Sequence, residues 1–204
     1  MISIRQIVTS AIAIIAVPAS ASTIHLIGPL IYKTGLITAP ALSISIINGP
    51  LIAFNQGPFP EVIEKFTDVI NSTDAAAAQI NGLVFYTEGG DVPSEVTEYY
   101  VSFVNHQVAL LSLLRDKAAL FTLLPVIGRP VTAILGDGQR STDGLGVKMV
   151  AAIDSSYGGL NSQVVTARAR LNAAYTLTAA SYDGLIGLRK REEESKREIR
   201  AFIA

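Results

Sequence analysis

Apolar side chains recur every three to four residues along much of the chain, which is the spacing of an amphipathic helix. The first stripe opens at Pro60, a residue that suits the first turn of a helix, and the acidic Glu61 and Glu64 follow it. It predicts a helix that ends near residues 88–90, where paired glycines stop the pattern. The stripe consists of Val62, Phe66, Val69, Thr73, Ala76 or Ala77, Ile80 and Val84.

A second stripe follows with the same spacing. Residues 93–95, Pro-Ser-Glu, suit a helix cap and first turn. The stripe predicts a long helix to about Leu124, because Pro125 and Pro130 then break the chain. Its positions are Val96, Tyr100, Phe103, Gln107, Leu110, Leu114, Ala118 and Phe121.

The last stripe lies nearer the C-terminus. Gly136–Gly146, with the sequence GDGQRSTDGLG, predicts a loop, and Val131–Leu135 before it predicts at most a short helix. A helical pattern then runs from Leu145 to Leu185, and Gly158-Gly159 should break or bend it, since each glycine costs about 1 kcal/mol against alanine. Long helical stripes, short joins and no strand alternation over residues 58–188 predict an all-α domain, an antiparallel helical bundle.

Residues 22–57 are apolar but interrupted. Lys33 is their only charge, and Gly28-Pro29, Pro40 and Gly49-Pro50 divide the apolar runs. We therefore expect an irregular apolar N-terminal extension that packs loosely on the bundle. The alternatives are an exposed apolar arm that binds surfaces or lipid, and an error in the predicted gene structure.

Residues 189–204, RKREEESKREIRAFIA, form a charged tail. Glu192 and Lys196, like Glu193 and Arg197, are spaced for helical ion pairs worth a few tenths of a kcal/mol. The tail is expected to extend the last helix into solvent. A basic membrane-surface role is the alternative, although the glutamates dilute the positive charge.

Residues 1–21 have the pattern of a secretory signal peptide. Arg5 supplies a positive start, Ile7–Val17 an apolar segment, and Ala19-Ser20-Ala21 a small-residue cleavage site after Pro18. We expect cleavage after Ala21 and a secreted, extracellular or cell-wall protein. An N-terminal membrane anchor is the alternative, but the apolar run is shorter than the roughly 20 residues that span a bilayer. We expect no transmembrane segment after cleavage.

Composition narrows the classes of function. The chain has no cysteine, so disulfides cannot stabilise it and apolar packing must. A formal net charge of −1 gives no basic footprint, and we expect no nucleic-acid partner.

Residues with catalytic chemistry are few. His25 falls in the extension, and His106 lies beside the second stripe, where a half-buried structural role is expected. Gly136–Gly146 lacks the Gly-Lys-Ser/Thr ending of a phosphate-binding loop. Asp137, Asp143 and Asp154 are too irregular for a calcium loop. We expect no enzyme activity, no cofactor and no metal site.

One modification motif is present. Asn71-Ser72-Thr73 is an acceptor for N-linked glycan in a secreted protein. Thr73 belongs to the first stripe, so Asn71 is expected to point away from it and to serve as the glycosylation site.

Two segments carry a family resemblance. Asp68–Asp91, DVINSTDAAAAQINGLVFYTEGGD, resembles the Ala-rich opening helix of the fungal hydrophobic surface-binding protein A and cell wall galactomannoprotein family. Met149–Tyr175 is similar to a later helix of that family. The resemblance covers about Glu61 to Leu188. In the first segment it rests on Val69, Ala76, Ile80, Tyr86, Gly89 and Gly90.

The resemblance implies a secreted or wall-associated protein without catalytic activity. Such a protein would bind a hydrophobic surface, or a fatty acid or similar lipid, through its bundle, with cell-wall polysaccharide as a further partner. The alternative is a structural or interaction cell-wall glycoprotein without a small-molecule ligand. The implied lining residues, which core packing alone would also explain, are Phe66, Val69, Tyr100, Phe103, Leu110, Met149 and Val164.

Overall fold

The computed structural model describes residues 19–44, 58–85, 92–121 and 128–203, and the side chains of residues 25–44, 58–85, 93–118 and 131–183. These residues form an all-α bundle, as the stripes predict. An isolated bridge between Phe85 and Ile153 is its one strand-like pairing in the described ranges. The elements are α1 (Ala19–Ser43), α2 (Pro58–Ile80), α3 (Val92–Phe121), α4 (Gly128–Ala152), the short 3-10 helix η3 (Ser155–Tyr157) and α5 (Gly158–Ile203).

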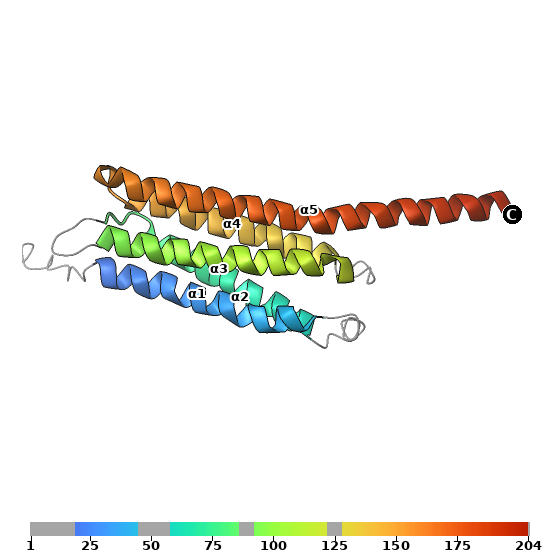
Figure 1. The fold of residues 1–204 in the computed structure, drawn as a ribbon, viewed down its shortest axis with the longest axis horizontal. Coiled ribbons are helices and arrows are strands. Elements are labelled where there is room, and N and C mark those ends of the chain that lie inside the picture. Colours follow the sequence, from blue (N-terminus) through green and yellow to red (C-terminus); the bar gives the residue numbers. More distant parts are fainter. Residues whose placement is uncertain (1–18, 45–57, 86–91, 122–127, 204) are drawn as a thin grey trace, which may run out of the picture.

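The five long helices close into a ring. The main contacts join α1 to α2, α2 to α4, α4 to α5, α5 to α3, and α3 back to α1. Consecutive helices run in opposite directions along one long axis (Figure 1). Every helix therefore turns one face toward a common interior, and α5 continues alone past the end of the other four (Figure 1).

Helix α1 corrects the expectation of an irregular extension over 22–57. Its buried positions Ile27, Leu30 and Ile37 are at most 1% exposed, and the stripe continues through Ala41 and Ile44. The helix contains Pro29 and Pro40, each costing about 3 kcal/mol. Burial of each large aliphatic side chain contributes about 1.5–3 kcal/mol, so the stripe outweighs the prolines. Residues 45–57 of the predicted extension lie outside the described residues.

Helix α4 corrects the predicted loop at Gly136–Gly146, which lies within it. The apolar period continues through the segment, because Leu135, Leu145 and Met149 are all buried. Gly138 lies against the rings of Phe66 and Tyr175, so its missing side chain serves packing. Glycine here permits a close helix contact and does not end the helix.

The remaining boundaries follow local chemistry. Helix α2 ends at Ile80, earlier than the predicted 88–90, because Gly82 adopts a left-handed φ of 83° that terminates helices. The predicted break at Gly158-Gly159 is confirmed: α4 ends before it, and α5 begins there after η3. Helix α5 reaches Ile203, which confirms that the charged tail is helical.

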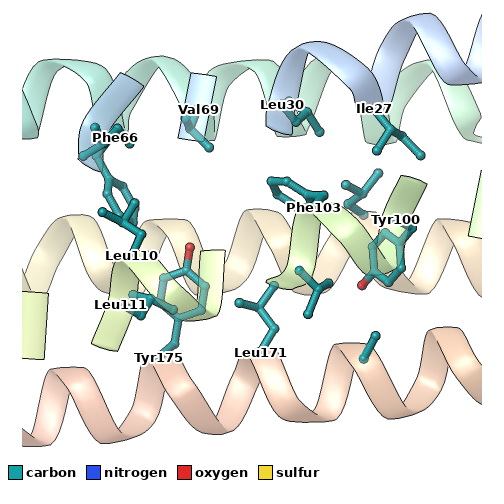
Figure 2. Packing of buried hydrophobic residues seen from close by; sticks show 14 of the residues in the cluster. Ile27, Leu30, Phe66, Val69, Tyr100, Phe103, Leu110, Leu111, Leu171 and Tyr175 are labelled. Carbon is teal, nitrogen blue, oxygen red and sulfur yellow. The ribbon is translucent and has the colours of Figure 1, made fainter. Parts of the chain in front are cut away.

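The core is continuous across the ring. Figure 2 shows Ile27 and Leu30 of α1, Phe66 of α2, and Leu171 and Tyr175 of α5 meeting around side chains of α3. The Phe66 and Tyr175 rings pack edge to face with centroids 6.5 Å apart. No helix in the described ranges is both long and apolar enough to cross a membrane.

Candidate functional site

The seven side chains proposed as lining all lie in the interior of the ring. Each is buried, with at most 2% of its surface exposed. Burial is required both of core residues and of residues around a ligand, so their role as lining stays a prediction. They come from four helices: Phe66 and Val69 from α2, Tyr100, Phe103 and Leu110 from α3, Met149 from α4 and Val164 from α5.

An apolar cavity lies at the end of the bundle where α2 and α4 begin. Its volume is about 10 Å³, which is room for about one water molecule. Pockets for small ligands usually enclose about 300–1,000 Å³, so this cavity is an apolar gap in the packing and the bundle is closed to a ligand in this structure. Of the seven proposed residues, Phe66 alone borders it. The lining is Phe59, Val62, Ile63, Phe66, Leu114, Val131, Ile134, Leu135 and Tyr182.

The one hydroxyl of this lining is already paired. Tyr182 Oη donates to the carbonyl oxygen of Leu114 at 2.9 Å. Burial raises the pKa of the Tyr182 phenol, so it stays neutral. The cavity therefore offers apolar contact and leaves its hydroxyl engaged with the backbone.

Two glycines of α4 admit tyrosines from other helices. A β-carbon at Gly146 would lie 2.6 Å from Tyr100 Oη, and one at Gly138 would lie 2.9 Å from Tyr175 Oη. Such distances are too short for real contacts, so each hydroxyl occupies space that a side chain would need. Sequence reasoning missed both positions because it assigned the segment to a loop.

An ion pair stands beside Tyr100. Arg168 donates from Nε to Asp143 Oδ1 at 2.6 Å and from Nη2 to Oδ2 at 2.8 Å. Asn172 Nδ2 donates to the same Oδ1 at 2.5 Å. The hydrogen bond from Arg168 is the main cause that lowers the pKa of Asp143, and the same bond raises the pKa of Arg168. The pair joins α4 to α5 and stays charged at neutral pH.

Buried polar groups without partners gather on α3. Tyr100 Oη, Thr97 Oγ1 and Gln107 Oε1 have no hydrogen-bond partner among the described residues, and all three side chains are fully buried. Gln107 Nε2 is satisfied, because it donates to Thr34 Oγ1 at 2.9 Å. Thr34 lies on a helical stripe with residues 27, 30, 37, 41 and 44. Sequence reasoning missed this stripe because it took Pro29 and Pro40 as breaks.

The histidines give no catalytic geometry. His106 is exposed, contrary to the half-buried position expected for it, and its Nδ1 lies 2.9 Å from the carbonyl oxygen of Ser102. His25 is exposed on α1, so it lies on a helix and not in an irregular arm. The described residues contain no group of three His, Cys, Asp or Glu side chains that could hold a metal.

The acceptor motif lies on α2. Asn71 is exposed, as predicted, whereas Thr73 is fully buried and donates to the carbonyl oxygen of Val69 at 2.7 Å. Lys33 Nζ donates to Ser72 Oγ at 2.6 Å, which ties α1 to α2 beside the motif. Attachment of a glycan to Asn71 stays a prediction.

No protein-family model matches the chain, and a search of curated protein sequences finds no match. Among solved structures the chain is similar to AfMP4p, a mannoprotein of Aspergillus fumigatus, in complex with palmitic acid. The TM-score is 0.68 at 14% identity, over 80% of this chain and 99% of that one. The chain thus has the helical fold of a fungal mannoprotein.

Proposed function

We propose that this protein binds a fatty acid or a similar lipid inside its helical bundle and has no catalytic activity. The observation that carries the proposal is the apolar interior of the five-helix ring, with its cavity between α2, α3, α4 and α5. AfMP4p, which has the same fold, is complexed with palmitic acid. An apolar chain favours such an interior because its transfer from water contributes about 0.8 kcal/mol per methylene.

Binding a whole chain requires the helices to part. The cavity of about 10 Å³ holds no part of a chain in the closed bundle, and side chains such as Phe103 and Leu110 fill the rest of the interior. The chain has no cysteine, so no disulfide ties one helix to another. Opening the ring therefore breaks only non-covalent contacts, which the lipid then replaces.

We further propose that the protein is secreted and acts outside the cell or in the cell wall, as a member of the family that Asp68–Asp91 resembles. This part rests on the sequence of residues 1–21. N-terminal sequencing of the protein from its host's medium or wall is expected to begin at Ser22. A chain that begins at Met1 and stays in the cell would contradict it.

Native mass spectrometry tests lipid binding. The full chain is delipidated and mixed with palmitate or, as a polar control, with succinate. A one-to-one palmitate complex and no succinate complex are expected. A bundle that stays empty at high palmitate concentration contradicts the proposal.

The alternative is a structural wall glycoprotein, favoured by the exposed Asn71 on a helix that faces solvent. Asn71→Gln separates the two roles. It removes the glycan and leaves palmitate binding intact in a carrier. A glycoprotein without ligand would show loss of wall retention in N71Q and no palmitate complex in either form.

A further inference from the structure

A fatty acid would bring one polar group into this apolar interior. A buried carboxyl group needs hydrogen-bond donors, because removing it from water without replacing its hydrogen bonds carries a large free-energy cost. The place of the donors decides which way the ligand lies. This inference rests on the proposed function and adds the part of the site that holds the carboxyl group.

Two hydroxyls of α3, on residues about one helical turn apart, are available for that role. Tyr100 Oη and Thr97 Oγ1 are fully buried and have no partner among the described residues. Residues three apart lie on one face of a helix. Other buried threonines are satisfied within their own helix: Thr34, Thr73, Thr142 and Thr178 each donate to the carbonyl four residues earlier. Thr97 does not, so its hydroxyl stays open to a ligand.

The Tyr100 hydroxyl can donate to an acidic group, and the two charges beside it, Arg168 and its partner Asp143, offset each other. Burial raises the pKa of its phenol while the positive charge of Arg168 opposes that rise, so the hydroxyl keeps its proton and can donate. The position of a β-carbon on Gly146 would lie within 3 Å of both Tyr100 Oη and Arg168 Cδ. The phenol and the arginine therefore meet over the bare backbone of α4.

Other interior polar groups do not compete. Tyr182 Oη donates to the Leu114 carbonyl, and the Tyr175 hydroxyl is paired with Thr142. Gln107 Nε2 is engaged with Thr34, and its free Oε1 can only accept. Figure 2 shows the Tyr100 hydroxyl directed from α3 toward α5, into the bundle.

The distance to the cavity matches the ligand. Tyr100 and the cavity residue Leu114 lie on the same helix, about 21 Å apart at 1.5 Å per residue. An extended sixteen-carbon acid spans roughly 20 Å, since each C–C bond of about 1.5 Å advances it by about 1.3 Å. We propose that Tyr100, assisted by Thr97, hydrogen-bonds the carboxyl group of a bound fatty acid, whose chain runs to the cavity beside Tyr182.

Binding of palmitate and its methyl ester to the delipidated full chain tests this. Tyr100→Phe removes one hydroxyl and keeps the ring, and Thr97→Val removes the other. Each is expected to weaken palmitate binding about tenfold while changing methyl palmitate binding much less, because a hydrogen bond to a charged group is the stronger. Tyr99→Phe removes the hydroxyl of the half-buried neighbour and should bind like the unaltered protein.

Each outcome separates the inference from the function. Wild-type protein that binds neither lipid refutes the proposed function and the inference with it. Wild-type protein that binds palmitate, with Y100F and T97V binding it equally well, places the carboxyl group elsewhere and overturns the inference alone. Equal loss of acid and ester would assign Tyr100 a packing role and also overturn it. An unchanged or higher melting temperature is expected for Y100F, since its buried hydroxyl has no hydrogen-bond partner among the described residues to lose.

Discussion

Gly138 and Gly146 set how closely aromatic rings approach the backbone of α4. A β-carbon at Gly138 would lie 2.8 Å from Phe66 Cε1, and one at Gly146 would lie 2.6 Å from Tyr100 Oη. Gly144, in the same helix, has nothing within 4 Å of its β-carbon position. Glycine lowers helix propensity at both Gly144 and Gly146. Only at Gly146, however, does packing require it.

We predict that Gly146→Ala destabilises the protein by about 1–3 kcal/mol, because the added methyl forces buried Tyr100 and Arg168 to shift. Gly144→Ala is the matched control and should stabilise by about 0.5–1 kcal/mol through helix propensity. Urea unfolding measures both. Stabilisation by both substitutions would show that Tyr100 does not pack against α4 at this position.

The Asp143–Arg168 pair predicts a pH dependence. The folded state lowers the pKa of Asp143 below 3.8, so its contribution is complete above that pH. The contribution is lost as the pH falls through the lower pKa of the folded state. Because both side chains are 33% exposed, solvent screening limits it to about 1 kcal/mol.

Asp143→Asn is expected to lower stability at pH 7 by about that amount and to flatten the loss of stability below about pH 4. Urea midpoints between pH 2.5 and pH 7 measure the effect. Asp74→Asn, on the exposed face of α2, controls for removal of a surface carboxylate. If D143N and D74N gave the same profile, the pair would contribute nothing to folding.

At the scale of the element, α1 is the least expected part of the bundle. Its stripe has regular spacing of three and four, but Pro29 and Pro40 interrupt the helix propensity. Tertiary packing decides the outcome, because a helix with a buried face tolerates local costs that an isolated helix does not. The same reasoning explains α4, where glycines that resemble a loop are tolerated inside a helix.

Ile37→Ala tests whether α1 belongs to the core. Ile37 is fully buried, so we expect a loss of about 2–5 kcal/mol in the free energy of unfolding. Leu36, its neighbour, is 40% exposed, and Leu36→Ala should change that free energy by no more than about 0.5 kcal/mol. If both substitutions changed the free energy of unfolding by small and equal amounts, α1 would not belong to the core and would pack only loosely on the bundle.

Sequence patterns predicted the bundle through three stripes. Val62, Phe66 and Val69 on α2 and the series from Val96 to Ala118 on α3 are buried as their spacing indicated, while the side chain of Phe121 lies outside the described ones. The closed ring could not be predicted without α1, which supplies its fifth wall. The polar features of the interior also escaped the pattern, because a tyrosine on an apolar stripe gives no sign of whether its hydroxyl finds a partner.

At the scale of the whole molecule, the ring has two different ends. One end holds the apolar cavity at the start of α2 and α4, and α5 leaves the bundle beside it (Figure 1). Toward the other end, the hydroxyls of Thr97 and Tyr100 have no hydrogen-bond partner in the part of the chain that the structure describes. An amphipathic ligand of matching length could place its apolar end at the first and its polar group at the second.

Blocking the cavity should therefore change the length of chain that the bundle accepts. Val131 lines it, and Val131→Phe would occupy the space for the end of the chain. We expect palmitate to bind about tenfold more weakly, a loss of about 1.4 kcal/mol, and the shorter laurate to be much less affected. Val147→Phe makes the same change at a position of α4 that is 42% exposed and should alter neither. Equal loss of both acids in V131F would instead indicate a general defect in packing, because only a blocked end discriminates by length.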